Sequence, residues 1–354
     1  MGTLNLSKKD RILLPLGLVA FALAAVAEFS HLEPVITFVV AAVALAILAA
    51  VVGEATDHLG NRLNAGLTGA VQSALGNLPE LLFGIFALRA GLAPVVSAAL
   101  VGSVLANILL VLGMGFVAGG LRHGPQSFGR TSSRRMSLLF LLGTAIIAVP
   151  SLTALLHIPV AQHEQALSIA ASVVMLVLFV FSIPATLRGE TGEVARGEGE
   201  AGWPILFVGI VLLAAAVASG FVAEWFVNVL VDALDVLHIS EAFAGFVIVA
   251  IVGNAVEHVV GVQLMYRNKP AYAVNIMVQS PLQILFVMFP VLVLASAIFG
   301  WGAFTLVLSP LLLSVLALTA LVTTAVVAEG ESTWLEGVFL IGLYAVIATA
   351  FWWG

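Results

Sequence analysis

Long apolar segments recur along almost the whole of this 354-residue chain, and they restrict what it can fold into. Most are close to the ~20 residues that an α-helix needs to cross a bilayer. Hydrophobic residues make up 62% of the sequence and charged residues only 9%, unlike in ordinary soluble domains. The even spacing of the apolar segments argues against a β-barrel, whose strands would alternate apolar and polar positions over about 10 residues. The sequence therefore predicts an all-α polytopic membrane protein.

The apolar segments and the breaks between them predict eleven transmembrane helices. We expect these at residues 11–30, 34–56, 66–89, 93–118, 136–156, 164–187, 203–230, 241–265, 270–297, 302–326 and 333–353. The longest connecting loops are 119–135 and 188–202. For the first segment, a cleaved signal peptide ending near Ala27 is an alternative, because basic residues precede its apolar run. A retained helix fits the topology equally well and suits a transporter better.

The basic residues predict the orientation of these helices. With the N-terminus inside, 12 of the 13 lysines and arginines fall on the inner side, and only Arg89 falls outside. This asymmetry is what the positive-inside rule describes. Short loops favour a prokaryotic plasma (inner) membrane. We therefore expect a multi-pass protein of that membrane with a cytoplasmic N-terminus.

A short polar motif occurs twice, within the third and the eighth predicted helices. It reads GNLPE at residues 76–80 and GNAVE at residues 253–257, and the shift of 177 residues also superposes Ser103 on Ser280. We therefore predict an N-terminal helix (1–31), two five-helix repeats (32–187 and 203–354) and an acidic cytoplasmic linker (188–202). An odd number of spans in each repeat inverts one half relative to the other. Inverted repeats place substrate sites near the bilayer midplane.

Each motif offers the ligands of a hard cation. A carboxylate near the bilayer centre costs roughly 2.5–3.5 kcal/mol, so Glu80 and Glu257 are expected to face an ion, a partner or a cavity. Asn77 and Asn254 lie three residues earlier, on the same helix face. Their oxygens suit Ca²⁺, which takes 6–8 oxygen ligands, better than Mg²⁺. Pro79 predicts a disturbed helix in the first motif only.

The emptied site would contain two like charges, and protons can neutralise them. Two carboxylates held close together raise one another's pKa when the metal leaves. Occupancy by either one divalent cation or protons is the minimal requirement of an antiporter.

The helix after each motif carries further polar residues. Ser103 and Asn107 lie in the first half, and Ser280 and Gln283 lie in the second. Asn107 and Gln283 are one residue short of the repeat offset, so their equivalence is looser. We predict that these four side chains bind the cation or orient its ligands. Ordinary hydrogen bonding between helices is an equally good interpretation.

The stretches around both motifs resemble the paired α-repeats of calcium/proton exchangers, within the wider cation/calcium exchanger superfamily. The resemblance rests on GNLPELLFGIFALRAG and GSVLANILLVLGMG in the first half, and on GNAVEH and QSPLQILFVMFP in the second. It implies that Glu80 and Glu257 bind the cation and exchange protons, with the motif asparagines as co-ligands. It also implies ion-path gates, for which Glu54 and Glu224 are the candidates. The family usually has GNA-x-E in its first motif, so GNLPE also resembles the related sodium/calcium exchangers.

The predicted function is a secondary antiporter that exports cytoplasmic Ca²⁺ in exchange for protons by alternating access around the two glutamates. Sodium/calcium exchange, or transport of Mn²⁺ or another cation, is the nearest alternative. An intramembrane hydrolase and a passive channel are further classes. The sequence has no HExxH helix and no evident nucleophile beside a base, so we predict no enzyme. Besides Ca²⁺, protons and the lipid bilayer, we expect no cofactor and, at a net charge of −6, no nucleic acid. A homo-oligomer is compatible with the sequence.

Overall fold

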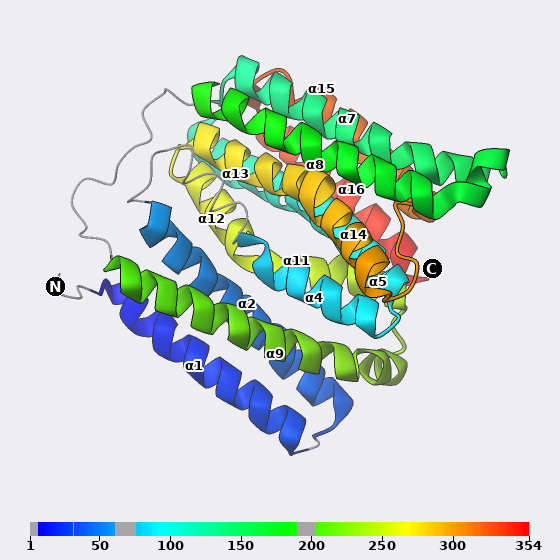
Figure 1. The fold of residues 1–354 in the computed structure, drawn as a ribbon. Helices are drawn as coiled ribbons and strands as arrows, with labels where there is room; N and C mark the ends of the chain where they lie inside the picture. Colours follow the sequence, from blue (N-terminus) through cyan, green and yellow to red (C-terminus); the bar gives the residue numbers. More distant parts are fainter. Residues whose placement is uncertain (1–5, 31, 61–75, 190–202, 354) are drawn as a thin grey trace. The chain divides into compact units, whose positions relative to one another are not determined.

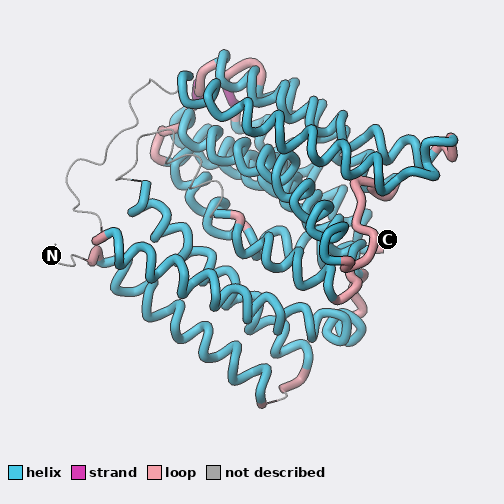
Figure 2. Tube along the Cα trace, in the orientation of Figure 1, coloured by secondary structure: helices cyan, strands magenta, loops and turns pink. Residues whose placement is uncertain are grey.

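The computed structural model of the protein describes residues 6–30, 32–60, 76–189 and 203–353. In these ranges the backbone is almost entirely helical (Figure 1, Figure 2). The helices form two compact units. The first comprises residues 1–90, 180–238 and 252–256, and the second comprises residues 91–179, 239–251 and 257–354. Each unit therefore contains helices from both predicted repeats.

The first unit is built around α2 and α9. Its helices are α1 (Lys8–Phe29), α2 (Pro34–Gly60), α4 (Leu78–Arg89), α9 (Ile205–Leu237) and the end of α8 (Glu164–Gly189). α2 packs against α1 and α9, and α4 packs against α9 (Figure 1). The ring of Phe226 on α9 lies 4.8 Å from that of Phe38 on α2 and 5.9 Å from that of Phe83 on α4. This aromatic cluster holds α4, which begins in the first motif, against its neighbours.

The second unit contains most of the remaining helices. They are α5 (Ala93–Leu105), α6 (Leu112–His123), α7 (Arg130–Leu155), most of α8, α10 (Glu241–Phe243), α11 (Ala250–Gly253), α12 (Ala255–Tyr266), α13 (Pro270–Gln283), α14 (Phe289–Phe299), α15 (Pro310–Val327) and α16 (Trp334–Trp352). Three π-helical turns are η1 (Ala106–Val111), η3 (Ala244–Val249) and η4 (Ile284–Met288), and η2 (Pro159–His163) is a 3₁₀ turn. α11 and α12 each have residues in the 252–256 segment of the first unit. Within the second unit, α16 packs along α6, α15 along α7, and η3 along α5.

Small residues let the helices of the second unit approach closely. A Cβ atom added at Gly102 of α5 would fall on the backbone of Phe246 in η3. Gly113 of α6 and Gly337 of α16 face each other in the same way. Lipid provides little hydrophobic drive for helix association, so membrane helices depend on this kind of close packing.

Helix bounds recur at the offset of the two motifs. The same separation relates the start of α5 at Ala93 to the start of α13 at Pro270. The π-helical turns η1 and η4 follow these two helices directly. The two halves thus share a helix start and the π-helical turn that follows that helix, as well as a motif.

The protein is a polytopic helical membrane protein, as predicted. Nine helices among the described residues are long and apolar enough to cross a membrane. A bent pair, Glu241–Gly253 with Glu257–Tyr266, adds a tenth and is bent by 63°. The third predicted helix is described only from residue 76 onwards, so the count of eleven remains a prediction. Almost all of the linker 188–202 lies outside the described residues.

One predicted helix begins later than the hydropathy indicates. Residues 302–309 are not helical, and α15 begins at Pro310 behind a Ser309 cap. The hydroxyls of Ser151 and Ser168 accept hydrogen bonds from backbone amides of this segment. Non-helical backbone is tolerated in a membrane protein where it is buried and hydrogen-bonded in this way. Hydropathy alone does not distinguish such a segment from a helix.

Loops that are predicted on the same side of the membrane contact one another. Two short strands, β1 (Gln126–Ser127) in the loop 119–135 and β2 (Glu331–Ser332) before α16, pair antiparallel. The Gln126 amide also donates to the carbonyl of Met265 before the α12–α13 turn. All three loops are predicted to be cytoplasmic. These contacts therefore agree with the prediction that the three loops lie on the same side of the membrane.

Candidate cation-binding residues

Both motifs interrupt a helix at their asparagine. The backbone is helical at Gly76 and Gly253, forms a turn at Asn77 and Asn254, and is helical again at the next residue. The glutamate of each motif consequently lies in the first turn of a new helix, α4 or α12. The sequence predicts a disturbed helix only in the first motif, around Pro79, whereas the structure has an interruption in the second motif as well.

Proline is not what interrupts these helices. Pro79 occupies the second position of α4, where the missing amide of proline needs no partner. The second motif has Val256 at that position and is interrupted at the same place. What the motifs share is glycine followed by asparagine, two residue types that occur often where helices end. The interruption is therefore a property of the repeat and not of the proline.

An interrupted helix can offer a cation backbone carbonyl oxygens as well as side-chain oxygens. The last carbonyl groups of the preceding half-helix have no amide partner within that helix, and such carbonyls coordinate cations in transporters. The first turn of the following half-helix favours the ionised form of a carboxylate through the helix dipole. The motifs can therefore present backbone and carboxylate oxygens within one short segment.

Parts of both motifs come together in the first unit. Glu80 is only 2% exposed, and Asn77 and Asn254 are also buried. A Cβ atom built on Gly253 would lie 3.7 Å from both Cβ and Cγ of Glu80. The glycine of the second motif therefore adjoins the carboxylate side chain of the first. It leaves beside Glu80 the space that a larger side chain would fill.

In the second unit the other motif glutamate lies beside a predicted ligand. The hydroxyl of Ser280 on α13 lies close to the carboxyl group of Glu257, which is partly buried. α13 also packs against α5 and η1, which carry the buried residues Ser103 and Asn107. The unit therefore brings the polar side chains that follow both motifs onto packed helices.

Asn107 and Gln283 occupy matching places at the two π-helical turns. Asn107 is the second residue of η1, and Gln283 immediately precedes η4. π-helical turns often mark functional sites because they change the direction of side chains. The Asn107 amide donates to the carbonyl of Ser103 at 3.1 Å, while its Oδ1 atom has no hydrogen-bond partner among the described residues. Because Asn107 is fully buried, this oxygen is suited to bind a cation.

The two candidate gate residues have different surroundings. Glu54 forms an ion pair with Lys9 of α1, and its Oε1 atom lies 3.8 Å from Nε2 of His58. Glu224 is partly buried on α9. Glu54 thus takes part in a polar contact between α1 and α2, which the sequence did not indicate because Lys9 and Glu54 are far apart in the chain.

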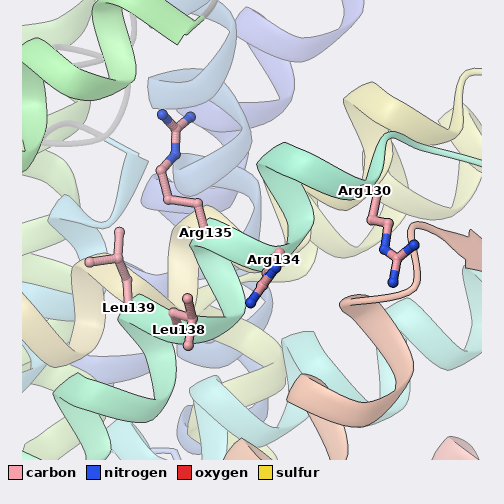
Figure 3. Close-up of a pocket in the computed structure, with 5 residues that line it drawn as sticks. All are labelled: Arg130, Arg134, Arg135, Leu138 and Leu139. Atoms are coloured by element: carbon pink, nitrogen blue, oxygen red, sulfur yellow. The ribbon is translucent and has the colours of Figure 1, made fainter.

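One cavity of the second unit has the wrong charge for a cation. It measures about 470 Å³ and is lined by Arg130, Arg134, Arg135, Leu138 and Leu139. Figure 3 shows the three arginine side chains leaving the first turns of α7 in different directions. Positive side chains repel cations, so this cavity is not the cation site.

The fold and these buried carboxylate and amide side chains define a polytopic membrane transporter. The family model for sodium/calcium exchanger proteins matches residues 33–187 and 206–353. The chain therefore belongs to the sodium/calcium exchanger family.

Relatives of this chain are similar over nearly their whole length. The Ca²⁺/H⁺ antiporter ChaA of Bacillus subtilis is 32% identical over 350 residues, which are 97% of this chain and 99% of that protein. A Ca²⁺/H⁺ antiporter of Synechocystis sp. is 30% identical over 373 residues, covering 98% of both chains. The solved structure of native YfkE has a TM-score of 0.83 at 31% identity, covering 97% of this chain and 100% of its own.

Proposed function

We propose that this protein is a secondary antiporter that exchanges Ca²⁺ for protons. The observation that carries the proposal is the duplicated helix interruption, which begins a new helix with a first-turn glutamate in each motif. The antiporter relatives from Bacillus subtilis and Synechocystis sp. support the same two ions.

The proposed ligands come from both repeats. Glu80 and Glu257 supply the charge, and Asn77 and Asn254 supply amide oxygens. The polar side chains of the following helices, Ser103, Asn107, Ser280 and Gln283, complete the coordination or orient the glutamates. Ca²⁺ accepts 6–8 oxygens in flexible geometry, so this mixed set suits it. The burial of Glu80 and the unpartnered Oδ1 of Asn107 support this assignment.

Proton coupling follows from the charge of the ligands. The sequences 78–88 and 255–266 around the two glutamates contain no lysine or arginine. When Ca²⁺ leaves, protons are thus the available neutralising charge for the carboxylates, because isolated charges are costly in the bilayer interior. Ca²⁺ and protons therefore compete for the same oxygens.

The exchange would proceed by alternating access, with movements of the interrupted helices opening one side at a time. Glu54 and Glu224 are the candidate gates along the ion path. The distribution of basic residues supports a cytoplasmic N-terminus. We place the protein in a prokaryotic plasma membrane, where it would export Ca²⁺ from the cytoplasm.

Uptake of ⁴⁵Ca²⁺ into proteoliposomes tests this function. We expect accumulation under an imposed pH gradient and none without a gradient. Glu80→Gln and Glu257→Gln should each abolish it, whereas Glu241→Gln, the same change at an exposed residue, should not. Uptake driven only by a sodium gradient would assign the protein to sodium/calcium exchange. No Ca²⁺ movement under either gradient would refute the substrate assignment.

A further inference from the structure

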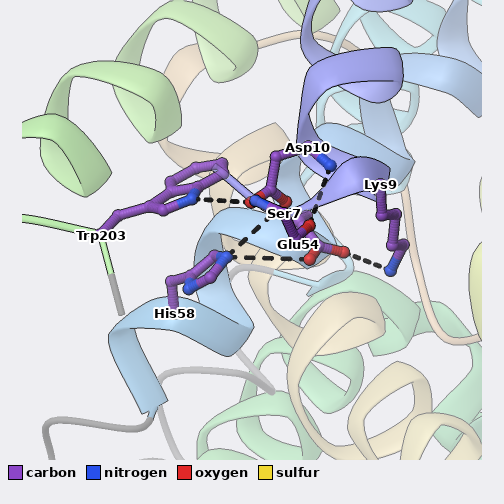
Figure 4. Close-up of polar contacts among 6 residues, drawn as sticks. All are labelled: Ser7, Lys9, Asp10, Glu54, His58 and Trp203. Atoms are coloured by element: carbon purple, nitrogen blue, oxygen red, sulfur yellow. Dashed lines mark hydrogen bonds and ion pairs between the residues drawn. The ribbon is translucent and has the colours of Figure 1, made fainter. Parts of the chain in front are cut away.

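A second cluster of metal-ligating side chains lies in the first unit, outside both motifs. Asp10 belongs to the first turn of α1, and Glu54 and His58 lie one turn apart on α2. Trp203, in the segment before α9, completes the cluster (Figure 4). All four are predicted at the cytoplasmic ends of their helices. Asp10 and Trp203 are 193 residues apart in the sequence, so only the fold brings the four residues together.

Each of the three residues directs one ligand atom to a common point. Nε2 of His58 lies 3.8 Å from Oδ1 of Asp10 and 3.8 Å from Oε1 of Glu54. All three atoms lie within 4.8 Å of one another. A metal ion binds nitrogen and oxygen ligands at about 2.0–2.2 Å, so a small movement of the side chains would close these gaps around one ion.

The ligand atoms of Asp10 and His58 lack other partners. Asp10 is 0% exposed and uses its Oδ2 atom for two hydrogen bonds, from the Ser7 amide at 2.8 Å and from Nε1 of Trp203 at 3.0 Å. Its Oδ1 atom, and Nε2 of His58, have no hydrogen-bond partner among the described residues. His58 is only 8% exposed. Buried polar atoms normally have a partner, so these two atoms are suited to bind a ligand.

The surrounding contacts fix the ligands in place. The ring of His58 stacks on that of Trp203 with centroids 4.3 Å apart and an interplanar angle of 19°. Ser7 and Asp10 form a reciprocal capping box at the start of α1. Lys9 pairs with the other oxygen of Glu54, and its side chain is 66% exposed. The site is therefore held in position by its neighbours, as metal ligands generally are.

We propose that Asp10, Glu54 and His58 bind a first-row transition-metal ion of the Mn²⁺, Co²⁺ or Zn²⁺ type, at a site distinct from that of the transported Ca²⁺. An imidazole with two carboxylates suits these metals, whereas Ca²⁺ prefers oxygen ligands alone. The bound ion would join α1 to α2, and the hydrogen bond from Trp203 to Asp10 would connect it to the segment before α9. It would also neutralise the buried Asp10 carboxylate.

Binding of Mn²⁺ to the purified full-length protein, followed by electron paramagnetic resonance, tests the site. The titration is done in the Glu80→Gln/Glu257→Gln variant and in wild type with saturating Ca²⁺, so that the transport site does not contribute. We expect one Mn²⁺ per chain in both. His58→Gln and Asp10→Asn should weaken binding at least about tenfold. His163→Gln, at an exposed histidine, is the matched control and should leave it unchanged.

Fluorescence provides a second readout that does not depend on transport. Co²⁺ bound at His58 should quench Trp203, and the quenching should be lost in Trp203→Phe. Asp10→Asn keeps an oxygen that accepts the Ser7 and Trp203 hydrogen bonds, so it tests the charge without removing the contacts. Absence of a stoichiometric Mn²⁺ site, or equal affinity in His58→Gln, would overturn the proposal. Either result leaves the Ca²⁺/H⁺ exchange untouched, because that is measured by uptake.

Discussion

A graded series at Gly253 tests whether the space beside Glu80 is needed for the cation. The Cβ of Gly253→Ala would lie 3.7 Å from Cβ and Cγ of Glu80, which is an ordinary van der Waals contact. Gly253→Val adds two methyl groups about 1.5 Å beyond that Cβ. At least one of them is expected to crowd the Glu80 side chain or occupy the space of its ligand.

The size of the effect follows from the contact distances. Overpacking of this kind costs about 1–3 kcal/mol. If this cost opposes cation binding, it lowers the Ca²⁺ affinity by a factor of ten for every ~1.4 kcal/mol. The Gly253→Val variant should therefore lose roughly 5- to 150-fold in Ca²⁺ affinity. Alanine, which makes only an ordinary contact, should change the affinity by less than about threefold.

Calorimetric Ca²⁺ titration of the purified variants measures these affinities. Gly209→Val on α9 is the control, because nothing lies within 4 Å of a Cβ at that exposed helical glycine. It introduces the same residue type into a helix without crowding a carboxylate. Equal affinities for Gly253→Val and wild type would refute the assignment of this space to the ion. A similar loss in Gly209→Val would attribute the effect to helix propensity instead.

Two further predictions concern stability and pH. Ser151→Ala should lower the free energy of unfolding by about 1–3 kcal/mol, because it leaves the buried Leu308 amide without its hydrogen-bond acceptor. The exposed Ser314→Ala should have a much smaller effect, and equal melting temperatures in detergent would contradict this argument. The Ca²⁺ affinity should fall as the pH falls, because protons and the cation compete for the same carboxylates. Affinity independent of pH, with no protons released on Ca²⁺ binding, would contradict proton competition.

The membrane class and the repeat could be predicted because they depend on local features. The apolar segments give the helices, and the two motifs are visible as short strings at a fixed separation. The position of the helix break at Asn77 and Asn254 could not be predicted in the same way. Pro79 is the helix-breaking signal of the first motif, yet the second motif is interrupted without a proline.

Long-range contacts account for most of what the sequence does not show. The hydropathy of residues 302–309 predicts a helix. The hydroxyls of Ser151 and Ser168, distant in the sequence, instead accept hydrogen bonds from the backbone of this non-helical segment. Asp10, His58 and Trp203 are each unremarkable in their local sequence, and a cluster of them depends on the packing of α1, α2 and α9. The local signals for that region are the capping pattern from Ser7 to Asp10 and the spacing of Glu54 and His58 by one helical turn.

The shared interruption also has an evolutionary consequence. Glycine and asparagine start the break in both halves, whereas the proline occurs in only one. If the halves arose by duplication, the break preceded their divergence. If each repeat has an odd number of spans, as predicted, an ancestral chain of half the length would have needed a second copy inserted with opposite topology to assemble a complete transporter. Fusion of the two genes would have removed that requirement for dual insertion. It would also have allowed position 79 and its counterpart 256 to evolve separately.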